Sequence, residues 1–77
     1  MSMTLPQIRD RLLSHDAEFQ RLVGEHSRYE TQLKQLSQTD YLSVEDILLQ
    51  ADLKKMKLRV KDEIERRIAL ASKSAVD

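Results

Sequence analysis

Apolar residues recur at helical spacing between positions 19 and 36. The side chains that follow one another at intervals of three and four are Phe19, Leu22, His26, Tyr29, Leu33 and Leu36. On an α-helix this spacing brings them to one face, as the core positions of a coiled coil do. The sequence therefore predicts a helix over about 16–37 with one packing face, which we call the seam. His26 is its single polar member.

A second run of apolar positions predicts a longer helix over about 44–71. Its seam residues are Leu49, Leu53, Met56, Val60, Ile64, Ile68 and Ala71. Their mean spacing is close to that of a straight α-helix, so no strong supercoil is required. Ser43, followed three residues later by Asp46, is typical of a helix N-terminal cap. Residues 72–77 show no pattern, and we expect them to fray.

The first part of the chain predicts a short helix over about 5–14. Thr4 precedes it as a capping residue, and Pro6 is tolerated because N–H groups of the first turn lack partners within the helix. Asp16 is a favourable N-cap for the next helix. The apolar spacing continues across this point, so the pattern also fits one continuous helix. We predict a kink or break at residues 14–16.

Residues 37–42 interrupt both patterns with short polar side chains, which indicates a turn. A connection this short makes the two long helices antiparallel. Aligning the seams places these residues level with each other: Leu33 with Leu49, Tyr29 with Leu53, His26 with Met56, Leu22 with Val60, and Phe19 with Ile64. All of these layers but one are apolar, which supports the pairing. We predict an all-α fold in one domain over 1–77, an antiparallel, coiled-coil-like helical hairpin with a short N-terminal helix.

Composition restricts how such a small fold is stabilised. The chain has 77 residues, no Cys, two His, one Gly and one Pro. Disulfides and a zinc-finger framework are excluded, and a chain of this size seldom buries enough apolar surface to be very stable alone. We therefore expect self-association to complete the core. The N-terminus resembles no signal peptide and no apolar run is long enough for a membrane span, so we expect a cytoplasmic protein without a membrane partner.

A second apolar stripe lies nearly opposite the seam of the last helix. Its members are Ile47, Ala51, Leu58 and Ala69. In a two-helix hairpin this face would be open to water, where polar residues are the norm. It is either a dock for the N-terminal segment that bears Leu5, Ile8 and Leu12 or a contact with another chain. We favour a second chain or a mixture of both, so these four residues are the candidate interface of a homo-oligomer.

Charge is balanced overall but not along the chain. Residues 1–53 carry five basic and nine acidic side chains, whereas residues 54–67 carry seven basic and three acidic ones. We favour the interpretation that Glu18, Glu25 and Glu30 of the preceding helix neutralise the basic segment within the hairpin. The alternative is that the segment binds an anionic partner such as nucleic acid. The residues that would do so are Lys54, Lys55, Lys57, Arg59 and Lys61.

Candidate catalytic and metal-binding residues are few. His15 and His26 lie eleven residues apart on one helix face, about 16.5 Å along the axis, so they do not share a metal within one hairpin. We interpret His26 as a register-setting residue that hydrogen-bonds a neighbour, with a metal site across a dimer as the alternative. The sequence holds no nucleophile–base pattern or phosphate-binding loop, so we expect neither enzyme activity nor a cofactor. Arg67 is level with Asp16, and we expect an ion pair or a helix cap between them.

Three segments taken together carry a family resemblance. They are His15-Asp16-x-x-Phe19-x-x-Leu22-x-x-x-His26, Tyr41-Leu42-Ser43-x-Glu45 and Leu53-Lys54-Lys55-Met56-Lys57-Leu58-Arg59-Val60-Lys61-Asp62-Glu63-Ile64. Over residues 8–68 the chain resembles the YdcH-like family, small bacterial proteins grouped as a domain of unknown function. Tyr29 and Ala17 depart from the family pattern, which has Leu and often Pro at these positions. The resemblance implies a cytoplasmic helical hairpin without an assigned activity.

These features predict a non-enzymatic helical hairpin that self-associates and serves as a protein–protein interaction module. An unidentified protein partner fits the same interpretation. The alternative is a nucleic-acid-associated accessory protein that uses the basic segment 54–61. The two differ in their response to salt, because phosphate binding weakens steeply as salt rises, whereas apolar helix docking does not.

Overall fold

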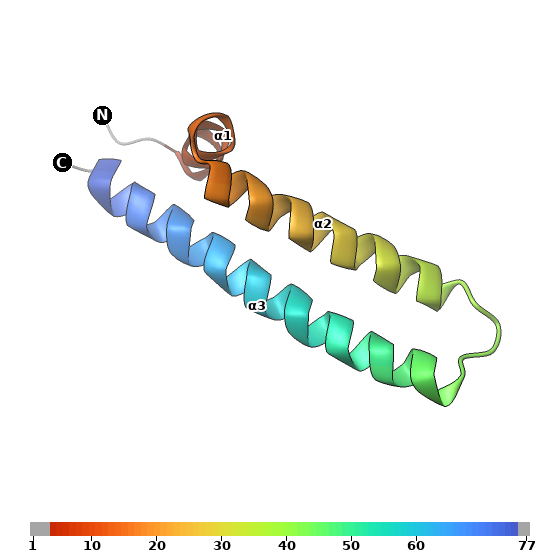
Figure 1. The fold of residues 1–77 in the computed structure, drawn as a ribbon. Helices are drawn as coiled ribbons and strands as arrows, with labels where there is room; N and C mark the ends of the chain where they lie inside the picture. Colours follow the sequence, from red (N-terminus) through yellow and green to blue (C-terminus); the bar gives the residue numbers. More distant parts are fainter. Residues whose placement is uncertain (1–3, 76–77) are drawn as a thin grey trace.

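The computed structural model describes residues 4–75, which form three helices. They are α1 (Leu5–His15), α2 (Ala17–Ser37) and α3 (Val44–Ala75). Helices α2 and α3 run antiparallel and side by side, and the turn between them forms one end of the molecule (Figure 1). The predicted all-α hairpin with a short N-terminal helix is confirmed. Its dimensions of 52 × 19 × 17 Å and radius of gyration of 15.9 Å describe a rod; a compact chain of this length would have a radius of gyration near 12 Å.

The N-terminus of each helix is capped by the residues that the sequence indicates. The Thr4 hydroxyl accepts a hydrogen bond from the Gln7 backbone N–H, and the Gln7 side chain accepts one from the Thr4 N–H in return. Ser43 and Asp46 make the same reciprocal pair at the start of α3, at 3.1 and 3.2 Å. These bonds satisfy N–H groups that have no partner inside a helix.

Asp16 divides the first two helices. Its backbone is extended, with φ −117° and ψ 105°, and its carboxylate accepts a hydrogen bond of 3.0 Å from the Phe19 N–H. Its own N–H donates to the Leu12 carbonyl, so it also closes α1. The predicted break at residues 14–16 is confirmed, and one residue performs both capping functions.

The end of α3 differs from the sequence prediction. A helix end at about 71 with a frayed tail over 72–77 was expected, but α3 continues through Ala75; residues 76–77 lie outside the described part. Ala71, Ser72 and Lys73 include no Gly or Pro, so nothing in the local sequence stops the helix. Lys73 in the last turn also favours it, because a cation interacts well with the negative end of the helix dipole.

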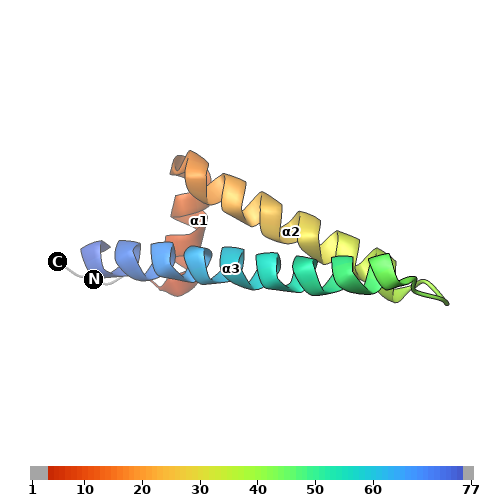
Figure 2. The same cartoon turned by 60° about the horizontal axis from the view of Figure 1, so that its bottom comes forward.

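Helix α1 lies across the open end of the hairpin. Figure 2 shows α1 running from the start of α2 toward α3, across the end of the hairpin opposite the turn. Ile8 of α1 is buried there, and Leu12 and Leu13 pack against the core of the hairpin. The short helix therefore covers apolar surface that the two long helices alone would leave open.

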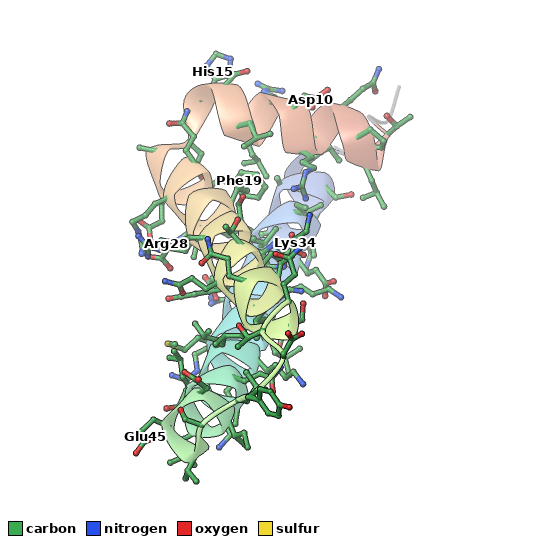
Figure 3. All side chains as sticks on the ribbon, turned by 90° about the vertical axis from the view of Figure 1, so that its right-hand side faces the viewer. Asp10, His15, Phe19, Arg28, Lys34 and Glu45 are labelled. Carbon is green, nitrogen blue, oxygen red and sulfur yellow. The ribbon has the colours of Figure 1, made fainter. Side chains whose placement is uncertain are left out.

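The core is concentrated at the end near α1. Phe19, Leu22, Val60 and Ile64 form one buried cluster, and Figure 3 shows Phe19 beneath α1 in the space between the long helices. Leu53 is buried nearer the turn. The half-buried seam residues are His26, Tyr29, Leu33, Leu36, Met56, Ile68 and Ala71.

Leu49 does not fit the predicted seam. It was paired with Leu33, but 46% of its surface is exposed. The seams are therefore not closed uniformly along the hairpin, and burial falls toward the turn. Regular spacing places a residue on a helix face but does not decide how much of it the neighbouring helix covers.

Replacing Asp16 tests how much its side chain contributes as the N-cap of α2. We expect Asp16→Ala to lower the free energy of unfolding by about 1–2 kcal/mol, because it removes the side-chain cap of α2. Urea denaturation followed by circular dichroism measures the change. Asp16→Asn is the matched control, since Asn caps a helix as well as Asp but carries no charge. Equal stability of Asp16→Ala and the unmodified chain would contradict the capping role.

Candidate functional site

The outer face of α3, opposite the seam, carries the main exposed apolar surface of the long helices. It consists of Val44, Ile47, Leu48, Ala51 and Leu58, which fall on one face at 100° per residue. The four large side chains are 70%, 53%, 61% and 58% exposed in that order, and Ala51 is exposed as well. We call these five residues the outer α3 face. Water contacts most of their side-chain surface in the single chain.

The composition of the outer α3 face extends the predicted interface. Ile47, Ala51 and Leu58 were predicted to lie there, but Val44 and Leu48 were not. Their signal was present in the sequence, because residues 44, 47, 48 and 51 follow the 3/4 spacing of a helix face. Leu48 adjoins the seam residue Leu49 in an apolar run, and Val44 is separated from that run by Glu45 and Asp46, so neither stands out from its neighbours.

Ala69, the fourth residue of the predicted interface, lies in a different environment. It lines an open, mostly apolar groove of about 490 Å³ between α1 and the last part of α3. The other lining residues are Leu5, Pro6, Arg9, Glu65 and Ile68. Of the two occupants predicted for the second apolar stripe, the N-terminal segment is therefore the one found near Ala69. The N-terminal segment does not cover the outer α3 face, which begins twenty-five residues earlier.

The outer surface of α2 is polar. Apart from Ala17 and Gly24, the exposed residues of α2 are charged, amide or hydroxyl side chains. The two long helices therefore offer different surfaces to a partner. Of the two, only α3 presents large apolar side chains that are exposed.

The basic segment 54–61 is only partly neutralised within the chain. Lys57 forms an ion pair of 3.2 Å with Glu30 of α2, and this hydrogen bond lowers the pKa of the Glu30 carboxyl. Within residues 4–75, no ion pair engages Lys54, Lys55, Arg59 or Lys61. These four side chains, from the predicted anion-binding set, are exposed.

The expected neutralisation of the basic region 54–67 by acids of α2 is therefore met in part: Lys57 pairs with Glu30, and Arg67 interacts electrostatically with Glu18. Glu18 and Glu25 both pair with Arg21 on their own helix. The hydrogen bond from Arg21 lowers the pKa of Glu18, and its acidic neighbours raise the pKa of Arg21 itself. Residues three and four positions apart meet on the helix surface, so a local pair forms in preference to a pair across the hairpin.

Arg67 joins the beginning of α2 to α3. Its guanidinium lies 3.7 Å from the Asp16 carboxylate and 3.5 Å from that of Glu63. The predicted ion pair with Asp16 is confirmed. It also supports the predicted alignment of the two long helices, because Arg67 and Asp16 are level in that alignment.

The histidines lie apart and have different surroundings. His15 is exposed at the end of α1 and points away from the hairpin (Figure 3). His26 is half-buried and close enough to Glu30 for electrostatic interaction, but its imidazole forms no hydrogen bond with the described residues. The expectation that it hydrogen-bonds a neighbour is not met. Among the described residues, no group of three metal-binding side chains gathers at any point.

His26→Leu tests whether the imidazole matters for stability. We expect the fold to persist and the melting temperature to stay equal or rise, because the substitution adds apolar surface to the seam and removes no hydrogen bond. Thermal unfolding by circular dichroism measures this. Unfolding of the variant would contradict the expectation. A melting temperature that divalent metal raises in the unmodified chain and not in His26→Leu would instead indicate a metal site across a dimer.

No helix within residues 4–75 has both the length and the apolar content needed to cross a membrane.

Comparison with curated proteins and with solved structures gives no match. A family model described as "Protein of unknown function (DUF465)" matches residues 19–68, from the core residue Phe19 through the turn to Ile68. The match omits residues 8–18 of the resemblance described above. It covers 50 of the 77 residues, and the chain belongs to the DUF465 family, whose members carry the YdcH-like domain.

Proposed function

We propose that this protein is a non-enzymatic interaction module that self-associates through the outer α3 face. The observation that carries the proposal is the exposure of Val44, Ile47, Leu48 and Leu58 on one helix face. Single exposed apolar residues are common on protein surfaces, but four large ones on one helix face, here with Lys55 among them, are typical of an interaction site. The rod shape supports the proposal too, because an extended hairpin leaves this face accessible along its length.

The size of the outer α3 face predicts a contact of moderate strength. Residues 44–58 span about 21 Å of helix, or four turns. Such a surface is smaller than the roughly 800 Å² per partner of a standard interface. Full burial of a Val, Leu or Ile side chain contributes about 1.5–3 kcal/mol, and association opposes this gain through lost translational and rotational freedom. We therefore expect a dimer that dissociates on dilution.

Size-exclusion chromatography with light scattering tests the proposal. We expect a mass near twice 9.0 kDa at high micromolar concentration and a fall toward the monomer mass on dilution. Sedimentation velocity over a concentration series measures the same equilibrium. A folded chain that remains at 9.0 kDa at the highest concentration would contradict self-association.

A second candidate function is supported by the basic segment. Lys54, Lys55, Arg59 and Lys61 lack acidic partners within the described residues and would meet an anionic partner such as nucleic acid. Anisotropy of a labelled oligonucleotide tests it. Binding that weakens steeply with salt and is lost in Lys54→Gln/Lys55→Gln would support this function. Absence of binding at low salt would exclude it.

A further inference from the structure

We propose that two copies of this chain pair with their α3 helices antiparallel and with Ala51 at the two-fold axis. This inference rests on the proposed function and adds the orientation and register of the contact. In this arrangement Val44 of each copy is level with Leu58 of the other. Ile47 is level with Lys55 of the other copy, whose aliphatic stem packs on apolar surface while its ammonium group reaches water.

The asymmetry of the hairpin selects α3 as the contact helix. A four-helix bundle that used α2 equally would bury a surface made of charged, amide and hydroxyl side chains. Burial of such groups costs free energy unless each finds a partner. Pairing through α3 alone avoids this cost, because the outer α3 face is on the opposite side from α2. A contact of the same patch with itself also closes as a dimer and does not propagate.

Side-chain size along the outer α3 face fits a central approach at Ala51. The small residue lies between Leu48 and Leu58, where two helices that meet at Ala51 come close together. The larger side chains on either side then fill the space where the helices diverge. Leu48 and Leu58 are both more than half exposed in the single chain, so both gain contacts.

Charge selects the antiparallel orientation. The first turn of α3 carries Glu45 and Asp46, whereas the segment 54–61 carries five basic residues and no acid. With Ala51 on the axis, an antiparallel pair places Glu45 and Asp46 of each copy level with residues 56–57 of the other, within its basic segment. A parallel pair would place the basic segments of the two chains beside each other, and like charges at close range oppose association. Antiparallel helix dipoles favour the same choice.

Single cysteines test the register, because the natural chain contains no Cys. Ala51→Cys, Val44→Cys and Leu58→Cys are prepared separately, with Thr31→Cys on the polar surface of α2 as the matched control. Each is oxidised under mild conditions and run on a non-reducing gel, after circular dichroism has established that it is folded. A disulfide requires Cα atoms within about 7 Å, so cross-linking reports register closely.

We expect Ala51→Cys to cross-link with itself and the other two single variants to remain monomeric on the gel. A mixture of Val44→Cys and Leu58→Cys, with one carrying a mass tag, should give the mixed dimer. Cross-linking of Val44→Cys and Leu58→Cys each with itself would show a parallel pair and overturn the inference. A dimer in light scattering with no cross-link, or with one at Thr31→Cys, would overturn the inference and leave self-association standing. A folded monomer in light scattering would overturn both.

Discussion

Phe19→Ala is expected to destabilise the chain enough to leave much of it unfolded at room temperature. Phe19 is the one fully buried large side chain in residues 4–75, and it lies where all three helices meet. Removing a buried Phe ring costs about 3–5 kcal/mol through lost burial and the cavity that remains. A single core in a chain of this length supplies only about 3–5 kcal/mol in total.

The loss should appear as a reduced helical signal in circular dichroism and as a lower melting temperature. In a domain of this size, 1 kcal/mol corresponds to roughly 4–8 °C. Tyr41→Ala is the matched control, since it truncates an aromatic side chain that is 90% exposed in the turn; we expect a change within about 0.5 kcal/mol. If Phe19→Ala unfolds at the same temperature as Tyr41→Ala, the core is not centred on Phe19.

The long-range structure of this chain is largely predictable because its signals are periodic. Two seams with compatible spacing and a short turn leave one simple arrangement, and the 3.7 Å contact of Arg67 with Asp16 agrees with the predicted alignment. The caps at Thr4, Asp16 and Ser43 follow from local hydrogen bonding, which short polar side chains determine within three residues. The apolar spacing and the caps can both be read from residues that are close together in the sequence of one helix.

The properties that the sequence does not reveal depend on the angle between helices. Helices α2 and α3 cross at an angle (Figure 3), and α1 lies across their end opposite the turn (Figure 2); no residue pattern in either long helix specifies this arrangement. The exposure of Leu49 and the location of α1 near Ala69, away from Leu58, are consequences of how whole helices pack. Spacing along one helix therefore identifies an apolar face, but it does not show how much of that face the neighbouring helices bury.

The balance of charges along the chain also does not show which of two competing ion pairs an acidic residue forms. Glu18 and Glu25 have a basic residue three or four positions away on their own helix, and Arg21 takes both. A local pair needs no particular helix–helix geometry, whereas a pair across the hairpin does. The basic segment is consequently more available to a partner than charge balance alone would indicate.

Leu58→Glu is expected to abolish self-association without unfolding the hairpin. Leu58 is 58% exposed and lies opposite the seam, so its loss removes little of the core. Glu is also a favourable helix residue. In a symmetric dimer the substitution acts twice. Since 58% of the Leu58 surface remains to be buried, the loss is about 1–2 kcal/mol at each site and corresponds to a dissociation constant raised by roughly 30–10³-fold, before the cost of burying the carboxylates is added.

Sedimentation velocity over the same concentration series as the unmodified chain measures this loss, and circular dichroism checks that helicity is kept. Gln32→Glu is the matched control, because it adds one carboxylate at an exposed polar position of α2. We expect this control to dimerise like the unmodified chain, while Leu58→Glu stays at the monomer mass. A Leu58→Glu variant that still dimerises would show that the contact avoids the outer α3 face. A variant that loses its helicity would show that Leu58 supports the hairpin itself, because an exposed residue whose loss unfolds a chain must contribute more than a surface contact.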